Sequence, residues 1–243
     1  MPKRVSYSFL DPLILPLVPR LYRLLSIPRR FPPEGVILAG HLLAIAGAIG
    51  LVFATRTWWA GLLATVGVVG NHIADMVDGT HARTTNQCRN GGELLDHFTD
   101  PLSFSYWSIG LAVSVDNLVL ALAAVIIIYA TAMLTSIRAK LIGQFTLARF
   151  SPTEMKALYA LYGAVISGVV ASSGTAAAIV VAQVFFGFLL SMGLIQLIVN
   201  LAVSVRQVNA EGVPADTTPW ILAKGGETAQ DNTVLPEPKE NNA

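Results

Sequence analysis

Six long runs of mainly apolar residues divide this sequence, and they restrict it to folds whose main solvent is lipid. A helix needs about 20 such residues to cross a bilayer. Only 13% of the 243 residues are charged, whereas soluble domains carry about 25%. We therefore predict an all-α integral membrane bundle of six transmembrane helices within residues 35–205. The runs are about Gly35–Thr55, Trp58–Ala82, Gly92–Val115, Leu118–Arg138, Pro152–Ala171 and Thr175–Val205.

Residues 1–34 precede the first run and are interrupted by prolines and by Asp11. A cleavable signal has an unbroken apolar core, so this segment does not fit that class. Between Pro19 and Leu25, leucine and tyrosine side chains stand beside Arg20 and Arg23. This pattern is typical of an amphipathic helix whose basic side chains reach the lipid head groups. We predict an N-terminal interfacial segment that contains such a helix.

Lysine and arginine gather in alternate connections between the runs. Six of them precede the first run, and the third and fifth connections hold none. By the positive-inside rule, both termini and the connection between the second and third runs face the cytoplasm. The connection before the fifth run holds four basic residues, namely Arg138, Lys140, Arg149 and Lys156.

Two further patterns delimit the fifth run and the C-terminus. "SPTE" places Ser151 as the N-cap of a helix, Pro152 at its first position and Glu154 at its third, which forms a capping box. Residues 206–243 are rich in Asn, Thr, Pro, Glu and Asp. That composition buries too little apolar surface to fold, so we predict a disordered cytoplasmic tail.

Five acidic residues lie in the stretch "DMVDGTHARTTNQCRNGGELLDHFTD", where the second run ends and the third begins. Carboxylates at the edge of a membrane are costly and mark functional sites. Residues three or four apart share one face of a helix. The polar connection contains an Asn-Gly turn signal, so the two helices are antiparallel neighbours and their aspartates converge. The residues are Asp75 and Asp78 on one helix and Asp96 and Asp100 on the next, with Glu93 beside them.

Four converging carboxylates repel one another, and a hard divalent cation relieves that repulsion. Ligation by oxygen alone favours Mg²⁺, Mn²⁺ or Ca²⁺ over zinc. Metal held at a membrane surface suits a substrate that carries phosphate. The neighbouring residues agree: Gly79, Ala82 and Gly92 leave room for a ligand, and Arg83 is able to neutralise phosphate oxygens.

The acidic stretch resembles the signature of the CDP-alcohol phosphotransferase (CDP-alcohol phosphatidyltransferase) family, D-x2-D-G-x2-A-R-x8-G-x3-D-x3-D. All eight fixed places match with every gap correct. They are Asp75, Asp78, Gly79, Ala82, Arg83, Gly92, Asp96 and Asp100.

The resemblance implies a membrane transferase of phospholipid synthesis that moves a substituted phosphate from a CDP-linked donor to an alcohol hydroxyl and releases CMP. It implies a two-metal site with Mg²⁺ or Mn²⁺ and a homodimer in the membrane. By resemblance, Asp75, Asp78, Asp96 and Asp100 hold the metals, and Asp100 is the base that deprotonates the acceptor. The donor lies against Gly79 and Ala82, with Asp75, Arg83 and Gly92 beside it.

The direction of transfer has two interpretations. "GELLDHFTD" resembles the "GELFDHGCD" of the choline/ethanolamine phosphotransferase branch, in which a CDP-aminoalcohol reacts with diacylglycerol. "SPTE" is loosely similar to a "GPTE" stretch in some members. Glu93 and His97 are four apart, so Glu93 is placed to polarise His97 as a base. The alternative is phosphatidyl transfer from CDP-diacylglycerol to a small polar alcohol, because a six-span size is common among those members.

Two further expectations concern binding partners. Arg138 and Lys140 are candidate contacts for an acceptor or a lipid phosphate. No basic stripe with interleaved aromatic residues is present, so we expect no nucleic-acid partner. A divalent-cation transporter is the competing class of function, since acids in membrane spans also mark ion paths. The acids cluster at one face and do not continue across the bilayer, which disfavours that class.

Overall fold

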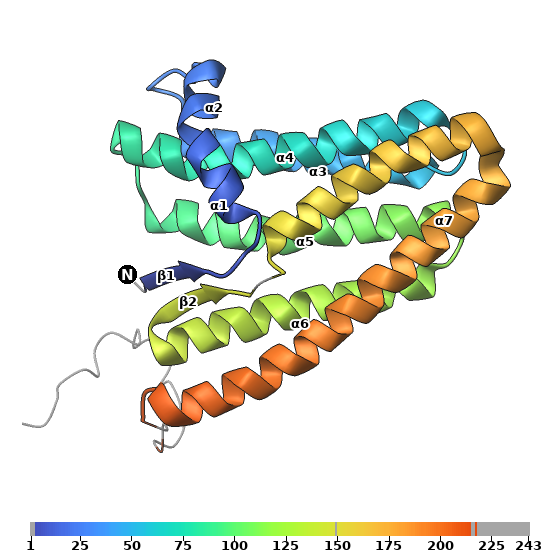
Figure 1. The fold of residues 1–243 in the computed structure, drawn as a ribbon. Helices are drawn as coiled ribbons and strands as arrows, with labels where there is room; N and C mark the ends of the chain where they lie inside the picture. Colours follow the sequence, from blue (N-terminus) through green and yellow to red (C-terminus); the bar gives the residue numbers. More distant parts are fainter. Residues whose placement is uncertain (1–2, 149, 215–216, 218–243) are drawn as a thin grey trace, which may run out of the picture. The chain divides into compact units, whose positions relative to one another are not determined.

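Five long helices form the framework of the protein, which is drawn from a computed structural model in Figure 1. The structure describes residues 3–148, 150–214 and 217, with side chains from residue 5 onward. Most of the predicted tail, residues 206–243, lies outside the described residues. The helices are α3 (Pro33–Phe53), α4 (Trp58–Thr85), α5 (Asn90–Ser114), α6 (Leu118–Ile142) and α7 (Pro152–Glu211).

The helix α7 spans 60 residues and covers both the fifth and the sixth predicted runs. Gly174 interrupts it with a φ of 78°, a left-handed backbone conformation that glycine adopts without a Cβ penalty. The interruption lies between the two predicted runs. The helix also continues to Glu211, so it extends past the predicted boundary at residue 205.

Four helices in the described part of the chain are long and apolar enough to cross a membrane, namely α3, α4, α6 and α7. The helix α5 is not among these four, and its first turns are acidic. The structure therefore supports an all-helical membrane protein with several spans, while the count of six remains a prediction.

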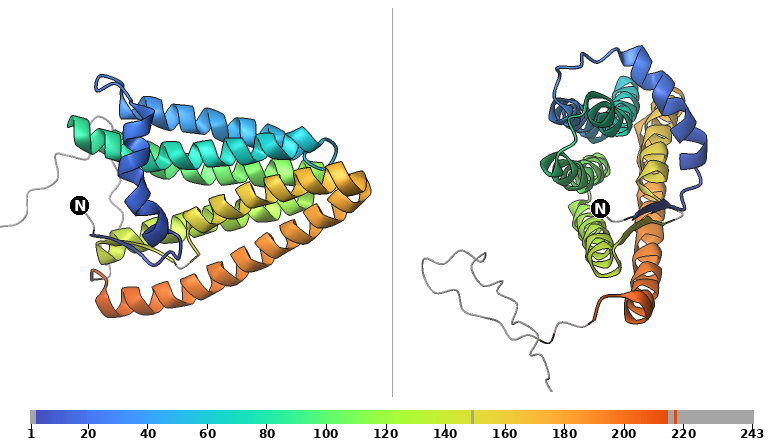
Figure 2. Two further views of the ribbon diagram at one scale, coloured as in Figure 1. Left: turned by 45° about the horizontal axis from the view of Figure 1, so that its top comes forward. Right: turned by 90° about the vertical axis from the view of Figure 1, so that its left-hand side faces the viewer.

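The long helices pack in a closed circuit: α3 on α4, α4 on α7, α7 on α6, α6 on α5 and α5 on α3. The end-on view in Figure 2 shows this arrangement. Small residues permit the closest approaches, because a Cβ added to Gly67 on α4 would lie 2.4 Å from the backbone N of Gly47 on α3. Trp107 on α5 donates from Nε1 to the carbonyl of Ala44 at 3.0 Å and so joins α5 to α3.

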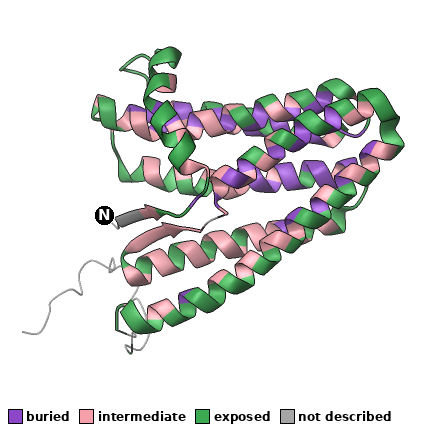
Figure 3. Cartoon of the chain, in the orientation of Figure 1, coloured by how far each residue is buried: buried purple, intermediate pink, exposed green. Residues whose placement is uncertain are grey.

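Burial separates the inside of this circuit from its outer surface (Figure 3). Buried residues concentrate where α3, α4 and α5 meet, and Trp107 and Leu111 are fully buried there. The outer faces of α6 and α7 expose large apolar side chains such as Ile126, Val184 and Ile195. An apolar surface of this extent suits contact with lipid.

The N-terminal segment crosses the ends of several long helices in Figures 1 and 2. It contains β1 (Lys3–Ser6), α1 (Asp11–Ile14), a 3₁₀ turn η1 (Leu15–Leu17) and α2 (Val18–Leu25). A helix is therefore present where the sequence predicts the amphipathic one. The strand β1 pairs in parallel with β2 (Gln144–Leu147), which follows α6. The sequence analysis missed this small sheet, because four-residue strands carry too little periodicity to detect.

Glu154 fastens the N-terminal segment to α7. Its Oε2 accepts from the backbone N–H of Ser151 at 2.8 Å, which confirms the predicted capping box. Its Oε1 accepts from the Ser8 hydroxyl at 2.6 Å and from the N–H groups of Phe9 and Leu10 at 2.8 and 3.0 Å. One buried carboxylate thus satisfies donors from the N-terminal segment and from the start of α7.

We expect Glu154→Gln to lower the melting temperature of the detergent-purified protein by about 5 °C. The amide replaces one acceptor oxygen by a donor, and a buried unsatisfied group costs about 1–3 kcal/mol, which a chain of this size registers as a few degrees per kcal/mol. Glu211→Gln, at the exposed end of α7, is the matched control and should melt like the wild type. Equal melting of both variants would contradict the role given to Glu154.

Candidate active site

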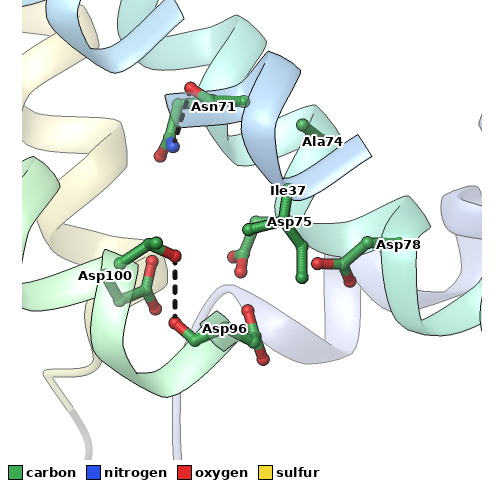
Figure 4. A pocket seen from close by; sticks show the side chains of 9 residues that line it. Ile37, Asn71, Ala74, Asp75, Asp78, Asp96 and Asp100 are labelled. Atoms are coloured by element: carbon green, nitrogen blue, oxygen red, sulfur yellow. Dashed lines mark hydrogen bonds between the residues drawn. The ribbon is translucent and has the colours of Figure 1, made fainter. Parts of the chain in front are cut away.

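The four motif aspartates line one pocket between the cytoplasm-predicted ends of α4 and α5 (Figure 4). The helix α4 ends at Thr85, and its C-cap Asn86, with a φ of 58°, turns the chain toward α5. The antiparallel pair this produces brings the carboxylates together, as their spacing predicts. The remaining lining residues come from α3, α4 and α5; they are Ile37, Gly40, Asn71, Ala74 and Thr99.

Lys156 of α7 completes the site, and the sequence analysis missed it. Its Nζ donates to Asp75 Oδ2 at 2.8 Å and to Asp100 Oδ1 at 2.9 Å. The side chain is only 1% exposed and passes over the Phe104 ring, 6.0 Å from its centroid. In the sequence, Lys156 resembles the other basic residues of the connection before the fifth run. The capping box is the signal that distinguishes it, because a helix that starts at Pro152 contains Lys156.

Asp78 and Asp96 differ from the other two aspartates, because neither forms an ion pair within the described residues. Asp78 is buried, and its Oδ1 accepts from the N–H of Gly79. Asn71, one turn below Asp75, donates to the carbonyl of Gly40 at 3.2 Å, while its Oδ1 is buried without a partner among the described groups. The pocket thus contains two carboxylates that are paired with Lys156, two that have no ion pair among the described residues, and the unpartnered amide oxygen of Asn71.

The donor set fits a hard divalent cation, because four carboxylates supply only oxygen ligands. In the described part of the chain, however, no three His, Cys, Asp or Glu side chains already stand in position to hold one ion. The Lys156 ammonium lies between Asp75 and Asp100 instead. Ligation by Asp75 and Asp100 would therefore require their contacts with the Lys156 ammonium to break.

The predicted donor-binding residues other than Asp75 lie beside this pocket and do not line it. Arg83 is exposed and folds back along α4, where its Nη1 would lie 3.2 Å from a Cβ at Gly79. Ala82 is half-buried on the same helix. Across the connection, a Cβ at Gly92 would meet nothing within 4 Å. This edge of α4 and α5 is open space bordered by small residues and one guanidinium.

Glu93 and His97 lie on the first turns of α5, on a face adjacent to that of Asp96 and Asp100. His97 Nε2 is 3.8 Å from Glu93 Oε1. The imidazole stacks on Phe145 of β2, with ring centroids 4.9 Å apart. The small sheet therefore contacts the His97 ring on one side through Phe145.

Arg138 and Lys140 lie in the last two turns of α6 and are not among the residues that line the pocket of the four aspartates. Arg138 Nη2 donates to Gln207 Oε1 near the end of α7, and its Nε is buried without a partner among the described groups. Neither basic residue forms a hydrogen bond or ion pair with an aspartate of the pocket in the described structure. Their assignment as acceptor or lipid-phosphate contacts remains a prediction.

His81, one turn after Asp78 on α4, anchors the segment that precedes α3. It is fully buried; its Nδ1 is 2.8 Å from the Tyr22 hydroxyl, and its Nε2 is 2.8 Å from the Phe31 carbonyl. Gln87 adds a bond from Nε2 to the carbonyl of Arg29 at 2.9 Å. These contacts hold residues 22–31 against the cytoplasm-predicted end of α4.

Comparison with known proteins identifies the family of the chain. The sequence model of the CDP-alcohol phosphatidyltransferase family matches residues 36–205, so the chain belongs to this family. Cholinephosphotransferase 1 of Mus musculus is 33% identical to the chain over 95 residues, which are 37% of this chain and 24% of the mouse protein. Cholinephosphotransferase 1 of Homo sapiens is 30% identical over 94 residues, or 36% and 23% of the two chains. The matched region thus covers about a quarter of each of these curated relatives.

We expect His81→Leu to expose the N-terminal segment to trypsin. The substitution removes both contacts of the imidazole, so the exposed Arg23, Arg29 and Arg30 should be cleaved several-fold faster. Tyr22→Phe removes only one of these contacts and should give an intermediate rate. Identical cleavage rates for His81→Leu and wild type would refute this anchoring role.

Proposed function

We propose that this protein is a metal-dependent enzyme of phospholipid synthesis that transfers a substituted phosphate from a CDP-linked donor to an alcohol hydroxyl and releases CMP. The observation that carries this proposal is the pocket lined by all four aspartates of the complete family motif. A pyrophosphate donor brings several negative oxygens to such a pocket. Carboxylates alone would repel it, so they must act through a bound cation.

The divalent metal is Mg²⁺ or Mn²⁺, in agreement with the general metal dependence of the family. Asp75, Asp78, Asp96 and Asp100 would hold it. When bound, it neutralises the pyrophosphate oxygens and stabilises the charge that develops on the leaving CMP. Arg83 and the small residues Gly79 and Gly92 border the open edge beside the pocket, where the nucleotide has room to lie.

In the proposed reaction the acceptor hydroxyl oxygen attacks the phosphorus that carries the alcohol group of the donor. A new phosphorus–oxygen bond forms, and the bond from that phosphorus to the bridging oxygen breaks, so CMP leaves with the bridging oxygen. The hydroxyl proton passes to a base of the protein, either Asp100 in the pocket or His97 beside it. The geometry supplies a partner for each, because Lys156 pairs with Asp100 and Glu93 lies 3.8 Å from His97.

We favour a CDP-aminoalcohol as donor and diacylglycerol as acceptor. The Glu93–His97 pair supports this choice, because it matches the pattern of the aminoalcohol branch and the imidazole stacks on Phe145 beside the pocket. Similarity to the two cholinephosphotransferases adds support. The alternative is phosphatidyl transfer from CDP-diacylglycerol to a small polar alcohol, for which Arg138 and Lys140 would be the acceptor contacts.

The membrane arrangement belongs to the same proposal. Six spans place both termini and the pocket at the cytoplasmic face, with the two parts of α7 on either side of Gly174 as the last two crossings. Residues 1–34 then lie in the interface, and the exposed Leu13, Leu24 and Leu25 point into lipid. The protein acts as a homodimer without a nucleic-acid partner.

We expect Asp78→Asn and Asp96→Asn each to reduce CMP release by about 100-fold or more, because each removes a ligand of the charge-stabilising metal. CMP release is measured with the purified protein in detergent with Mn²⁺, and EDTA should abolish it reversibly. Asp116→Asn, an exposed aspartate at the opposite end of α5, is the matched control and should retain full activity. Full activity in both pocket variants would refute the proposed reaction.

We expect CDP-choline or CDP-ethanolamine with diacylglycerol to support turnover, and Glu93→Gln and His97→Ala to reduce it by about 100-fold. The comparison is CDP-diacylglycerol with glycerol phosphate, inositol phosphate, serine or inositol. Turnover with this second set alone would reject the favoured donor and keep the family reaction. Arg138 and Lys140 would then be the candidate contacts for the small polar acceptor.

A further inference from the structure

Lys156 contacts two of the carboxylates to which the proposed function assigns metal. Its ammonium lies 2.8 Å from Asp75 Oδ2 and 2.9 Å from Asp100 Oδ1, and its side chain is 1% exposed. A buried ammonium is stable only while it is paired with negative charge. The Lys156 ammonium and a divalent metal from solution would therefore compete for the same two oxygen atoms.

The contacts divide the pocket into two halves. Asp75 and Asp100 are compensated by Lys156, whereas Asp78 and Asp96 form no ion pair in the described structure. All four line the same small pocket. An arriving divalent cation thus finds two carboxylates available and two held by an ammonium that it must displace.

We propose that Lys156 is the internal counterion of the aspartate pocket and that divalent metal binds by exchange with it for Asp75 and Asp100. This inference rests on the proposed metal-dependent function. Because the ammonium leaves only as the metal enters, the carboxylates have a positive charge beside them at every stage of the exchange. It also makes the metal affinity of the site lower than that of the same four carboxylates without the lysine.

The surroundings of Lys156 suit an ammonium that is held near the pocket but not locked to one position. Its backbone is fixed, because Glu154 two residues earlier binds Ser8, Phe9 and Leu10. Its head group lies 6.0 Å from the Phe104 ring centroid, and its hydrogen bonds go only to Asp75 and Asp100 among the described groups. A four-carbon stem with rotatable bonds allows the ammonium to withdraw while α7 stays in place.

A purely structural lysine would give a different result. If Lys156 served only to join α7 to α4 and α5, its removal would lower stability and leave the metal affinity of the folded protein unchanged or weaker. Competition predicts the opposite sign, namely tighter metal binding after the ammonium is removed. Metal affinity therefore separates the two roles, whereas activity and melting temperature do not.

The test is a calorimetric titration of the full chain in detergent with Mn²⁺ alone. Lys156→Met, which keeps the length of the apolar stem and removes the charge, should bind Mn²⁺ about tenfold more tightly than wild type, equivalent to about 1.4 kcal/mol. Lys156→Arg, which retains the charge in a bidentate fork, should bind several-fold more weakly than wild type. Arg206→Met removes an exposed positive charge elsewhere on α7 and should leave the affinity unchanged.

The outcomes keep the inference and the proposed function distinct. Suppose that the wild type binds Mn²⁺, that Asp96→Asn abolishes this binding, and that Lys156→Met binds Mn²⁺ equally or more weakly than the wild type. This result overturns the exchange and leaves the proposed function standing. Wild type that does not bind Mn²⁺ overturns both. If Lys156→Met does not purify in folded form, Lys156→Arg decides alone, and affinity equal to or tighter than wild type overturns the exchange.

Discussion

Repulsion among four neighbouring carboxylates is the constraint on which this structure depends. Asp75 and Asp78 come from α4, Asp96 and Asp100 come from α5, and all four line one pocket, where Asp78 is buried and the other three are half-buried. Unpaired charges in such surroundings are costly, so the helices cannot adopt this packing without positive charge between them. Lys156 supplies that charge from α7, and its two short hydrogen bonds tie three helices together at one point.

The N-terminal segment is the second element that organises the site, and it does so through polar contacts with residues far along the chain. Glu154 collects donors from residues 8–10, and His81 holds Tyr22 and Phe31. The strand β1 pairs with β2, whose Phe145 stacks on His97. Each contact lies within a few residues of a pocket aspartate, of Lys156 or of the Glu93–His97 pair. The segment that the sequence marks as interfacial therefore also frames the site.

Local patterns predicted what depends on local sequence. The apolar runs predicted the long helices closely, the "SPTE" box predicted the start of α7, and the aspartate spacing predicted convergence in one pocket. Features that depend on distant segments were missed. Lys156 reads as a basic residue near a membrane edge until α7 packs on α4, and nothing near His81 indicates that Tyr22 and Phe31 cap it. The four-residue strands of the small sheet likewise depend on partners more than 100 residues apart.

The interruption at Gly174 divides α7 into two mechanical parts. The part before it belongs to the site: a Cβ at Gly61 of α4 would lie 2.5 Å from the Gly163 carbonyl, and Thr65 donates to the Ala160 carbonyl at 2.9 Å. The part after it packs on α6, where Gly193 meets Ile127 and Gln207 meets Arg138. The helical hydrogen-bond ladder does not pass through residue 174. The two parts are joined by side-chain contacts instead: Phe185 stacks on Tyr162 with ring centroids 4.4 Å apart, and Gln196 donates to the Phe150 carbonyl at 2.7 Å. A change of bilayer thickness that tilts the second part of α7 therefore reaches Lys156 and the aspartate pocket through Tyr162 and Phe150, not through a continuous helix.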